Sequence, residues 1–193
     1  MSGVITALQK ASRAGTLSET AVQFAGLLER QDPEADPSVL LAGALAAERA
    51  LAGDVCIDLA SIAGSISWEG DSDGALVAPD LSIWRKALWR CSLVGDGGRL
   101  SPLVLTDDGR LYLYRYYALE CRLAEAIGRH ARRVSHSVDG LSLAEGLDTF
   151  FSDDPGSADQ RAAAAKAVDH HLLVISGGPG LSLIHISEPT RPY

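Results

Sequence analysis

The order of three segments near the end of the chain constrains its fold most. An alanine-rich stretch from Asp159 to about His170 predicts a helix, the apolar run Leu172–Ile175 predicts a buried strand, and Gly177-Gly178-Pro179-Gly180 predicts a tight turn. A helix, an apolar strand and a glycine-rich turn in this order are typical of the start of an α/β domain that binds phosphate. We therefore expect the first helix and the first strand of such a domain here.

The expected phosphate-binding loop is incomplete. The full pattern is G-x-x-x-x-G-K-[ST], in which backbone N–H groups surround phosphate oxygens and the lysine neutralises their charge. If Gly177 is its first glycine, the second glycine, the lysine and the hydroxyl are expected at positions 182 to 184, where the chain has Ser182, Leu183 and Ile184. The turn alone therefore leaves two interpretations open, a nucleotide-binding loop and a structural turn without a ligand.

The residues before this region predict a mainly α-helical domain. Thr16 and Glu19 have the spacing of a capping box, and Asp36 followed by Pro37 is typical of a helix start. The apolar run that follows stops at Gly53, a residue that commonly ends a helix. These two segments are expected to form a helical hairpin.

A further helix is expected after Pro79, with Leu81, Trp84 and Leu88 on one face. Trp84 and Trp89 leave two interpretations open. Aromatic side chains can stack on nucleic-acid bases, but on an amphipathic helix they more often pack in the core. The core role is favoured.

A β-hairpin and a long helix are expected next. The apolar runs Leu103–Leu105 and Leu111–Tyr114 flank Asp107-Asp108-Gly109, which is a typical hairpin turn. The helix is expected from about Tyr116 to Arg132. One stripe of this helix is apolar: Leu119, Leu123 and Ile127. Its basic end either contacts phosphate or complements the helix dipole, and the second interpretation is favoured.

The chain is acidic, with a net charge of −8 and a pI near 5.0. Domains that grip nucleic acid normally present a basic surface, because phosphate neutralisation supplies most of their affinity. The composition therefore argues against a DNA-gripping role for this chain.

The cysteines and the apolar runs exclude further classes. Cys56, Cys91 and Cys121 are far apart and odd in number, which favours reduced thiols over metal ligands or disulfides. The longest apolar run, Val39–Ala47, is too short to span a bilayer, and the N-terminus shows no signal-peptide pattern. A cytoplasmic protein without a bound metal is expected.

The segment Phe151–Ser157 (FSDDPGS) has the composition of a linker. It separates an expected helical domain, residues 1–150, from the expected start of an α/β domain, residues 158–180. Residues 151–157 are therefore the expected domain boundary.

Two stretches resemble the start of the motor core of superfamily 1 DNA helicases. They are Asp159–Ala164 (DQRAAA) and Val174–Gly180 (VISGGPG), and the resemblance is to the RecD family in particular, the alpha subunits of exodeoxyribonuclease V. Upstream segments resemble the helical N-terminal domain of the same family: residues 55–59, 102–105 and 111–116.

The resemblance implies an ATP-dependent 5′-to-3′ DNA helicase subunit of an exonuclease complex that acts in recombinational repair of double-strand breaks. It implies RecB- and RecC-like partner subunits, DNA, and the cofactors ATP and Mg²⁺. Gln160 maps onto the glutamine that contacts adenine, and Gly177, Gly178, Pro179 and Gly180 map onto the phosphate loop. The other interpretation is a non-enzymatic helical adaptor that docks on partner proteins, with a plain structural turn at these four residues.

Residues Leu181–Tyr193 (LSLIHISEPTRPY) do not resemble the continuation of that family. Leu181–Arg191 matches the translation of a transposon-end sequencing adapter, so a non-biological tail joined at Gly180 is expected. Phosphoryl transfer needs the lysine and the metal-binding hydroxyl of the loop. The chain itself is therefore expected to contain no catalytic residue, to bind no nucleotide productively and to hydrolyse no ATP.

Overall fold

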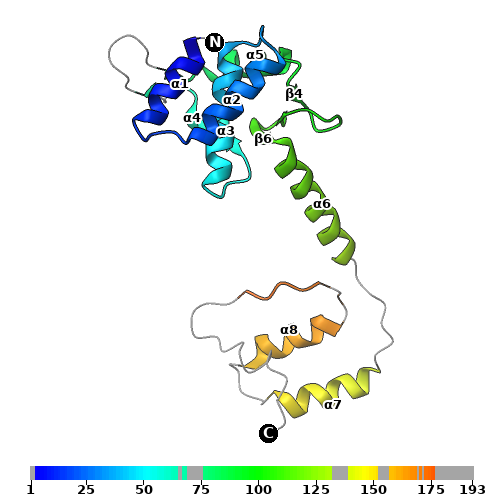
Figure 1. The fold of residues 1–193 in the computed structure, drawn as a ribbon. Coiled ribbons are helices and arrows are strands. Elements are labelled where there is room, and N and C mark those ends of the chain that lie inside the picture. The colour runs from blue at the N-terminus through cyan, green and yellow to red at the C-terminus, as the bar shows by residue number, and fades with distance from the viewer. Residues whose placement is uncertain are drawn as a thin grey trace. The chain divides into compact units, whose positions relative to one another are not determined.

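The computed structural model describes residues 3–64, 67–68, 76–131, 139–151, 157–168, 170 and 172–176. The chain divides into two compact units, residues 1–122 and residues 123–193. Helices predominate, and the described strands form one sheet of four strands and one of two (Figure 1). The expected class, a mainly α-helical N-terminal domain with a β-hairpin, is confirmed.

Helix α3 (Pro37–Leu51) is the centre of the first unit, and every residue from Val39 to Ala47 is buried. Helices α1 (Gly3–Arg13) and α2 (Glu19–Gln31) pack against it. A Cβ at Gly43 would overlap Cδ1 of Leu28, so a glycine there allows α2 to approach α3 closely. The predicted helical hairpin is confirmed as α2 and α3.

The start of α3 follows the prediction and the start of α2 does not. Asp36 caps α3, accepting a hydrogen bond from the Ser38 N–H at 2.8 Å, and Pro37 occupies the first turn. The cap of α2 is Ser18, so the predicted capping box of Thr16 and Glu19 is wrong. The Thr16 hydroxyl instead donates to the carbonyl of Ala11 at 2.9 Å, because the chain is still closing the end of α1 there.

The four-stranded sheet is built around the predicted hairpin. Strands β5 (Leu103–Leu105) and β6 (Arg110–Leu113) are antiparallel, with Leu103 opposite Leu113. Strand β1 (Ile57–Asp58) pairs with β6 in antiparallel and β4 (Val94–Gly95) with β5 in parallel, which gives the order β1-β6-β5-β4. The hairpin is confirmed, although its second strand begins and ends one residue earlier than predicted.

Short elements connect α3 to the hairpin. Asp58 ends β1 and caps the single turn α4 (Leu59–Ile62), accepting a hydrogen bond from the Ala60 N–H at 2.9 Å. Strands β2 (Ser67–Trp68) and β3 (Leu76–Val77) form the second, antiparallel sheet.

Helix α5 (Leu81–Arg90) packs against α3 and carries the buried Trp84. The Trp84 side chain is fully buried, and its Nε1 donates to the carbonyl of Ser38 at 2.9 Å. A buried indole needs such a partner, because an unpaired N–H in the core is costly. The predicted core role of Trp84 is confirmed, whereas Trp89 is exposed.

Helix α6 (Tyr114–His130) confirms the long helix predicted after the hairpin, although it starts at the last residue of the second predicted strand. Its predicted apolar stripe is exposed in all three members: Leu119, Leu123 and Ile127. The division between the compact units falls within this helix. Arg132 and Arg133 of the expected basic end lie outside the described residues.

The second unit contains two described helices, α7 (Gly140–Phe150) and α8 (Ala158–Val168), which pack against each other. Helix α8 confirms the alanine-rich helix predicted after residue 157, while α7 was not predicted. Most of the predicted linker, residues 152–156, lies outside the described residues, and the domain limits at 150 and 157 stay predictions.

The strand predicted at Leu172–Ile175 is wrong: residues 172–176 form no regular element. Val174 is 82% exposed, and Leu172 and Ile175 are exposed as well. A strand of this kind is stabilised by hydrogen bonds to neighbouring strands, and in an α/β domain those neighbours come from later in the sequence. No described strand pairs with this apolar run.

Candidate functional site

The nucleotide-site residue that the structure describes is Gln160, in the first turn of α8. The helix begins at Ala158, and Asp159 beside it complements the positive end of the helix dipole. Alanines at 162–165 favour the helix that follows. The side chain of Gln160 is half-buried, and among the described residues no hydrogen-bond partner holds its amide.

The residues next to Gln160 fix the position of α8. Arg161 forms an ion pair with Asp148 of α7, which ties the two helices together at the turn that carries Gln160. At the other end, Nδ1 of His170 lies 2.9 Å from the carbonyl of Lys166. His170 therefore closes the last turn of the helix, as the sequence predicts, and this contact occupies one of its ring nitrogens.

The predicted phosphate loop, Gly177, Gly178, Pro179 and Gly180, lies outside the described residues, as does the tail from Leu181. The nucleotide site therefore stays a prediction. Within the described ranges no three His, Cys, Asp or Glu side chains gather as metal ligands would. None of the described helices is both long and apolar enough to cross a membrane.

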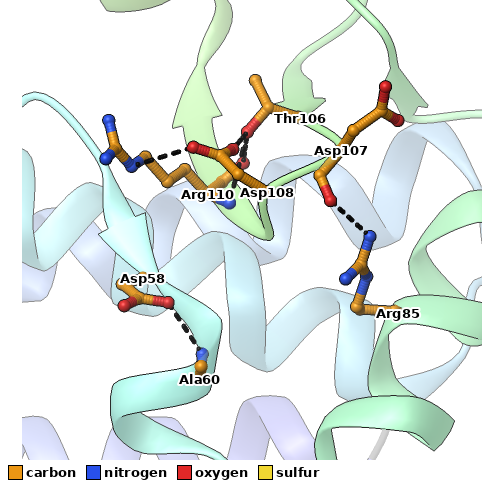
Figure 2. A network of polar contacts seen from close by, with 7 residues as sticks. All are labelled: Asp58, Ala60, Arg85, Thr106, Asp107, Asp108 and Arg110. Atoms are coloured by element: carbon orange, nitrogen blue, oxygen red, sulfur yellow. Dashed lines mark hydrogen bonds and ion pairs between the residues drawn. The ribbon is translucent and has the colours of Figure 1, made fainter.

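In the hairpin turn of the first unit, the charged side chains of Asp108 and Arg110 are held in internal contacts (Figure 2). The Thr106 hydroxyl contacts the Asp108 carboxylate, and Nε of Arg110 lies 3.2 Å from the same carboxylate. The hydrogen bond from Thr106 and the charge of Arg110 lower the pKa of Asp108. Arg85 of α5 donates to the carbonyl of Asp107 at 2.8 Å. These contacts hold the turn on α5, which indicates a structural role.

A surface groove of about 440 Å³ lies between the α2–α3 loop and α5. One wall carries the carboxylates of Asp32, Glu34 and Asp36, and the other carries Lys86 and Arg90. Sequence reasoning missed this groove. The spacing of its α5 residues was visible as i, i+3, i+4 and i+7 from Ile83, but the opposite wall comes from about fifty residues earlier.

The cysteines are free thiols, as the sequence predicts, and each is half-buried. Cys91 lies at the edge of the groove, 3.8 Å from Oδ2 of Asp32. Burial raises the pKa of the Cys91 thiol, and the negative charges of Asp32 and Asp36 raise it further. The groove is therefore electronegative on the side of the α2–α3 loop.

Comparisons with known proteins give one family. The model of the RecBCD enzyme subunit RecD, N-terminal domain, matches residues 13–112, which lie within the first compact unit. A RecBCD enzyme subunit RecD of Mycolicibacterium smegmatis is 33% identical over 148 residues, which are 76% of this chain and 24% of that protein. A RecBCD enzyme subunit RecD of Mycobacterium tuberculosis is 33% identical over 180 residues, which are 93% of this chain and 28% of that protein. The chain thus spans about a quarter of the length of these relatives.

Proposed function

This chain belongs to the RecD family, and from that premise we propose that it is the N-terminal part of an ATP-dependent 5′-to-3′ DNA helicase subunit. The complete subunit would act within an exodeoxyribonuclease V complex in the repair of double-strand breaks. In this proposal the first unit docks on RecB- and RecC-like subunits, and the ATP-driven motor begins in the second unit.

The observation that carries the proposal is the extent of the likeness. Residues 13–112 match the RecD N-terminal domain and include the buried helix α3 and the whole four-stranded sheet except the end of β6. The match to the Mycobacterium tuberculosis protein covers 180 residues, 93% of the chain. Because only about a dozen residues of the chain lie outside it, the match includes α8 and Gln160 whichever end those residues come from. The likeness therefore continues beyond the N-terminal domain into the expected motor.

The surface of the first unit supports a docking role. Besides Leu119 on α6, seven large apolar side chains among the described residues of this unit are exposed: Leu27, Leu51, Val55, Val77, Ile83, Trp89 and Leu100. The net charge of −8 disfavours binding to phosphate, while exposed aliphatic and aromatic side chains are typical of protein interfaces. Protein contacts are therefore the better use of this surface.

The nucleotide site of the complete subunit would start with Gln160 on adenine and Gly177, Gly178, Pro179 and Gly180 on phosphate. ATP bound there with Mg²⁺ supplies the free energy for strand separation. The chain as it stands has Leu183 where the loop needs its lysine. We expect this chain to dock on its partners and to hydrolyse no ATP, which is also the behaviour of the alternative, a purely non-enzymatic adaptor.

A binding measurement tests the docking part. The 193-residue chain is immobilised, and the purified RecB–RecC pair from the same genome is passed over it at physiological salt. The proposal is supported if binding is saturable and the complex stays together during size-exclusion chromatography. Absence of binding by a chain whose far-ultraviolet circular dichroism shows folded helices would contradict it.

Sequencing tests the motor part. Genomic DNA is amplified across the codon for Gly180 with a forward primer near the codon for Asp159. Codons for Thr-Gly-Lys followed by Thr or Ser support the helicase, because they complete the phosphate loop. Codons that continue with LSLIHISEPTRPY and then stop leave only the adaptor.

A further inference from the structure

The groove between the α2–α3 loop and α5 has two walls of opposite charge. Asp32, Glu34 and Asp36 stand on the loop side, and Lys86 and Arg90 on the α5 side. In the part of the chain that the structure describes, neither Lys86 nor Arg90 makes an ion pair or a side-chain hydrogen bond. The two walls therefore face each other without pairing.

The loop wall is held in place by its own contacts. The Ser92 hydroxyl donates to Oδ2 of Asp32 at 2.9 Å, and Asp32 caps the C-terminal end of α2. Asp36 is the N-cap of α3. Both carboxylates are therefore positioned by neutral donors, Ser92 at Asp32 and Ser38 at Asp36.

The α5 wall is a single stripe of the helix. Ile83, Lys86, Ala87 and Arg90 line the groove, while Trp84 and Leu88 face the core. Ile83 is 60% exposed and lies on this wall, one helical turn before Lys86. The groove thus offers carboxylates on one wall, and two cations beside an exposed apolar side chain on the other.

We propose that this groove is a docking site for a segment of a partner protein that carries a basic, an acidic and an apolar side chain. The basic side chain would meet Asp32, Glu34 and Asp36, the acidic one would meet Lys86 and Arg90, and the apolar one would cover Ile83. The inference rests on the proposed docking role of the first unit.

Charge complementarity selects this occupant over others. A nucleic-acid strand would bring phosphates against the carboxylate wall, which repels them. Small-molecule sites are lined mainly by apolar side chains, whereas five of the nine residues that line this groove are charged. A segment with both signs of charge satisfies both walls, and such pairing mainly sets the association rate and the choice of partner.

Charge reversal in the full chain tests the proposal against the RecB–RecC pair. The variants are Lys86→Glu with Arg90→Glu on one wall and Glu34→Lys on the other. Each is expected to weaken binding about tenfold, mostly through a slower association rate, with a weaker salt dependence than the unmodified chain. Glu34 is chosen because its carboxylate caps no helix, so the fold is preserved.

Matched controls carry the same charge changes elsewhere. Lys10→Glu with Arg13→Glu reverses two exposed cations in the last turn of α1, and Glu125→Lys reverses an exposed carboxylate of α6. The proposal is supported if the control variants bind like the unmodified chain while the groove variants bind more weakly. Groove variants that are folded and bind within twofold of the unmodified chain overturn it while the docking function stands, whereas failure of the unmodified chain to bind ends both.

Two further outcomes would show that the groove has a different occupant. Sedimentation that shows a dimer of the unmodified chain and monomers of the groove variants would assign the groove to a second copy and overturn the proposal. Binding of a single-stranded oligonucleotide that is lost in Lys86→Glu with Arg90→Glu would assign the groove to nucleic acid and would overturn the proposal too.

Alkylation of Cys91 gives an independent test. In a Cys56→Ser, Cys121→Ser background, protection of Cys91 from alkylation when the RecB–RecC pair is bound supports the proposal, and unchanged alkylation overturns it.

Discussion

The carboxylate of Glu48 accepts a hydrogen bond from the backbone N–H of Ser18 at 2.9 Å, across thirty residues of sequence. Ser18 is the N-cap of α2 and Glu48 lies on α3. In a capping box this acceptor comes from the third residue of the same helix, which here is Ala21. The buried helix α3 therefore supplies the acid that completes the cap of its neighbour.

Replacing Glu48 tests this cap. Glu48→Ala removes the acceptor and is expected to lower the free energy of unfolding by about 1–2 kcal/mol, the usual cost of a lost helix cap. Glu48→Gln keeps a carbonyl oxygen at the same reach and is expected to restore most of it. Urea unfolding followed by circular dichroism measures both, and an alanine variant as stable as the unmodified chain would contradict the finding.

Gly97 is expected to be sensitive to substitution for two separable reasons. Its φ is 94°, in the left-handed region, and a Cβ would overlap the ring of Tyr117. Gly97→Ala is expected to cost about 2–4 kcal/mol of stability, because it combines backbone strain with overpacking. Gly53→Ala is the matched control, since Gly53 has a φ of 96° and open space around its Cα.

The comparison of the two glycines isolates the Tyr117 contact. Tyr117 packs edge-on against Tyr112, with ring centroids 5.4 Å apart, so the displaced ring would disturb the start of α6 against the sheet. Gly53→Ala should therefore be the milder change in thermal unfolding. Equal losses of stability in the two variants would show that the Tyr117 contact contributes nothing.

Tyr112 makes stability depend on pH in the alkaline range. The residue is only 4% exposed, and burial raises the pKa of Tyr112 from 10.0 to about 12. A raised pKa in the folded state means that stability is complete below the unfolded value and is lost as pH rises from about 10 to about 12. Unfolding free energies at about pH 9 and about pH 11 are expected to differ by roughly 1 kcal/mol from this residue. Tyr112→Phe should reduce the difference.

Local sequence signals predicted the elements that depend on neighbours in sequence. Asp36 with Pro37 starts α3, and Asp107-Asp108-Gly109 turns the hairpin, because a cap and a tight turn need only a few adjacent residues. Trp84 was assigned to the core correctly from its place on an amphipathic helix.

Contacts between distant residues could not be predicted in the same way. The bond from Ser18 to Glu48 displaced the predicted capping box, and β1 and β4 are two-residue strands that exist only through their pairing with β6 and β5. The groove is likewise lined by residues that are distant in sequence, such as Asp32 at the end of α2 and Arg90 of α5. The apolar run at 172–175 shows the reverse case: its local signal predicts a strand, but no described strand pairs with it and it forms no regular element.

Gln160 gives the prediction that separates a motor from an adaptor. Residues 1–180 are joined to the downstream sequence of the gene, and ATP and GTP hydrolysis are compared in the complete subunit. If Gln160 contacts adenine, Gln160→Ala should raise KM for ATP about tenfold and leave KM for GTP nearly unchanged, because a base-specific hydrogen bond is lost. Lys166→Ala, later on the same helix, is the control and should leave both values unchanged. Equal effects of Gln160→Ala on the two nucleotides would show that this side chain does not contact adenine.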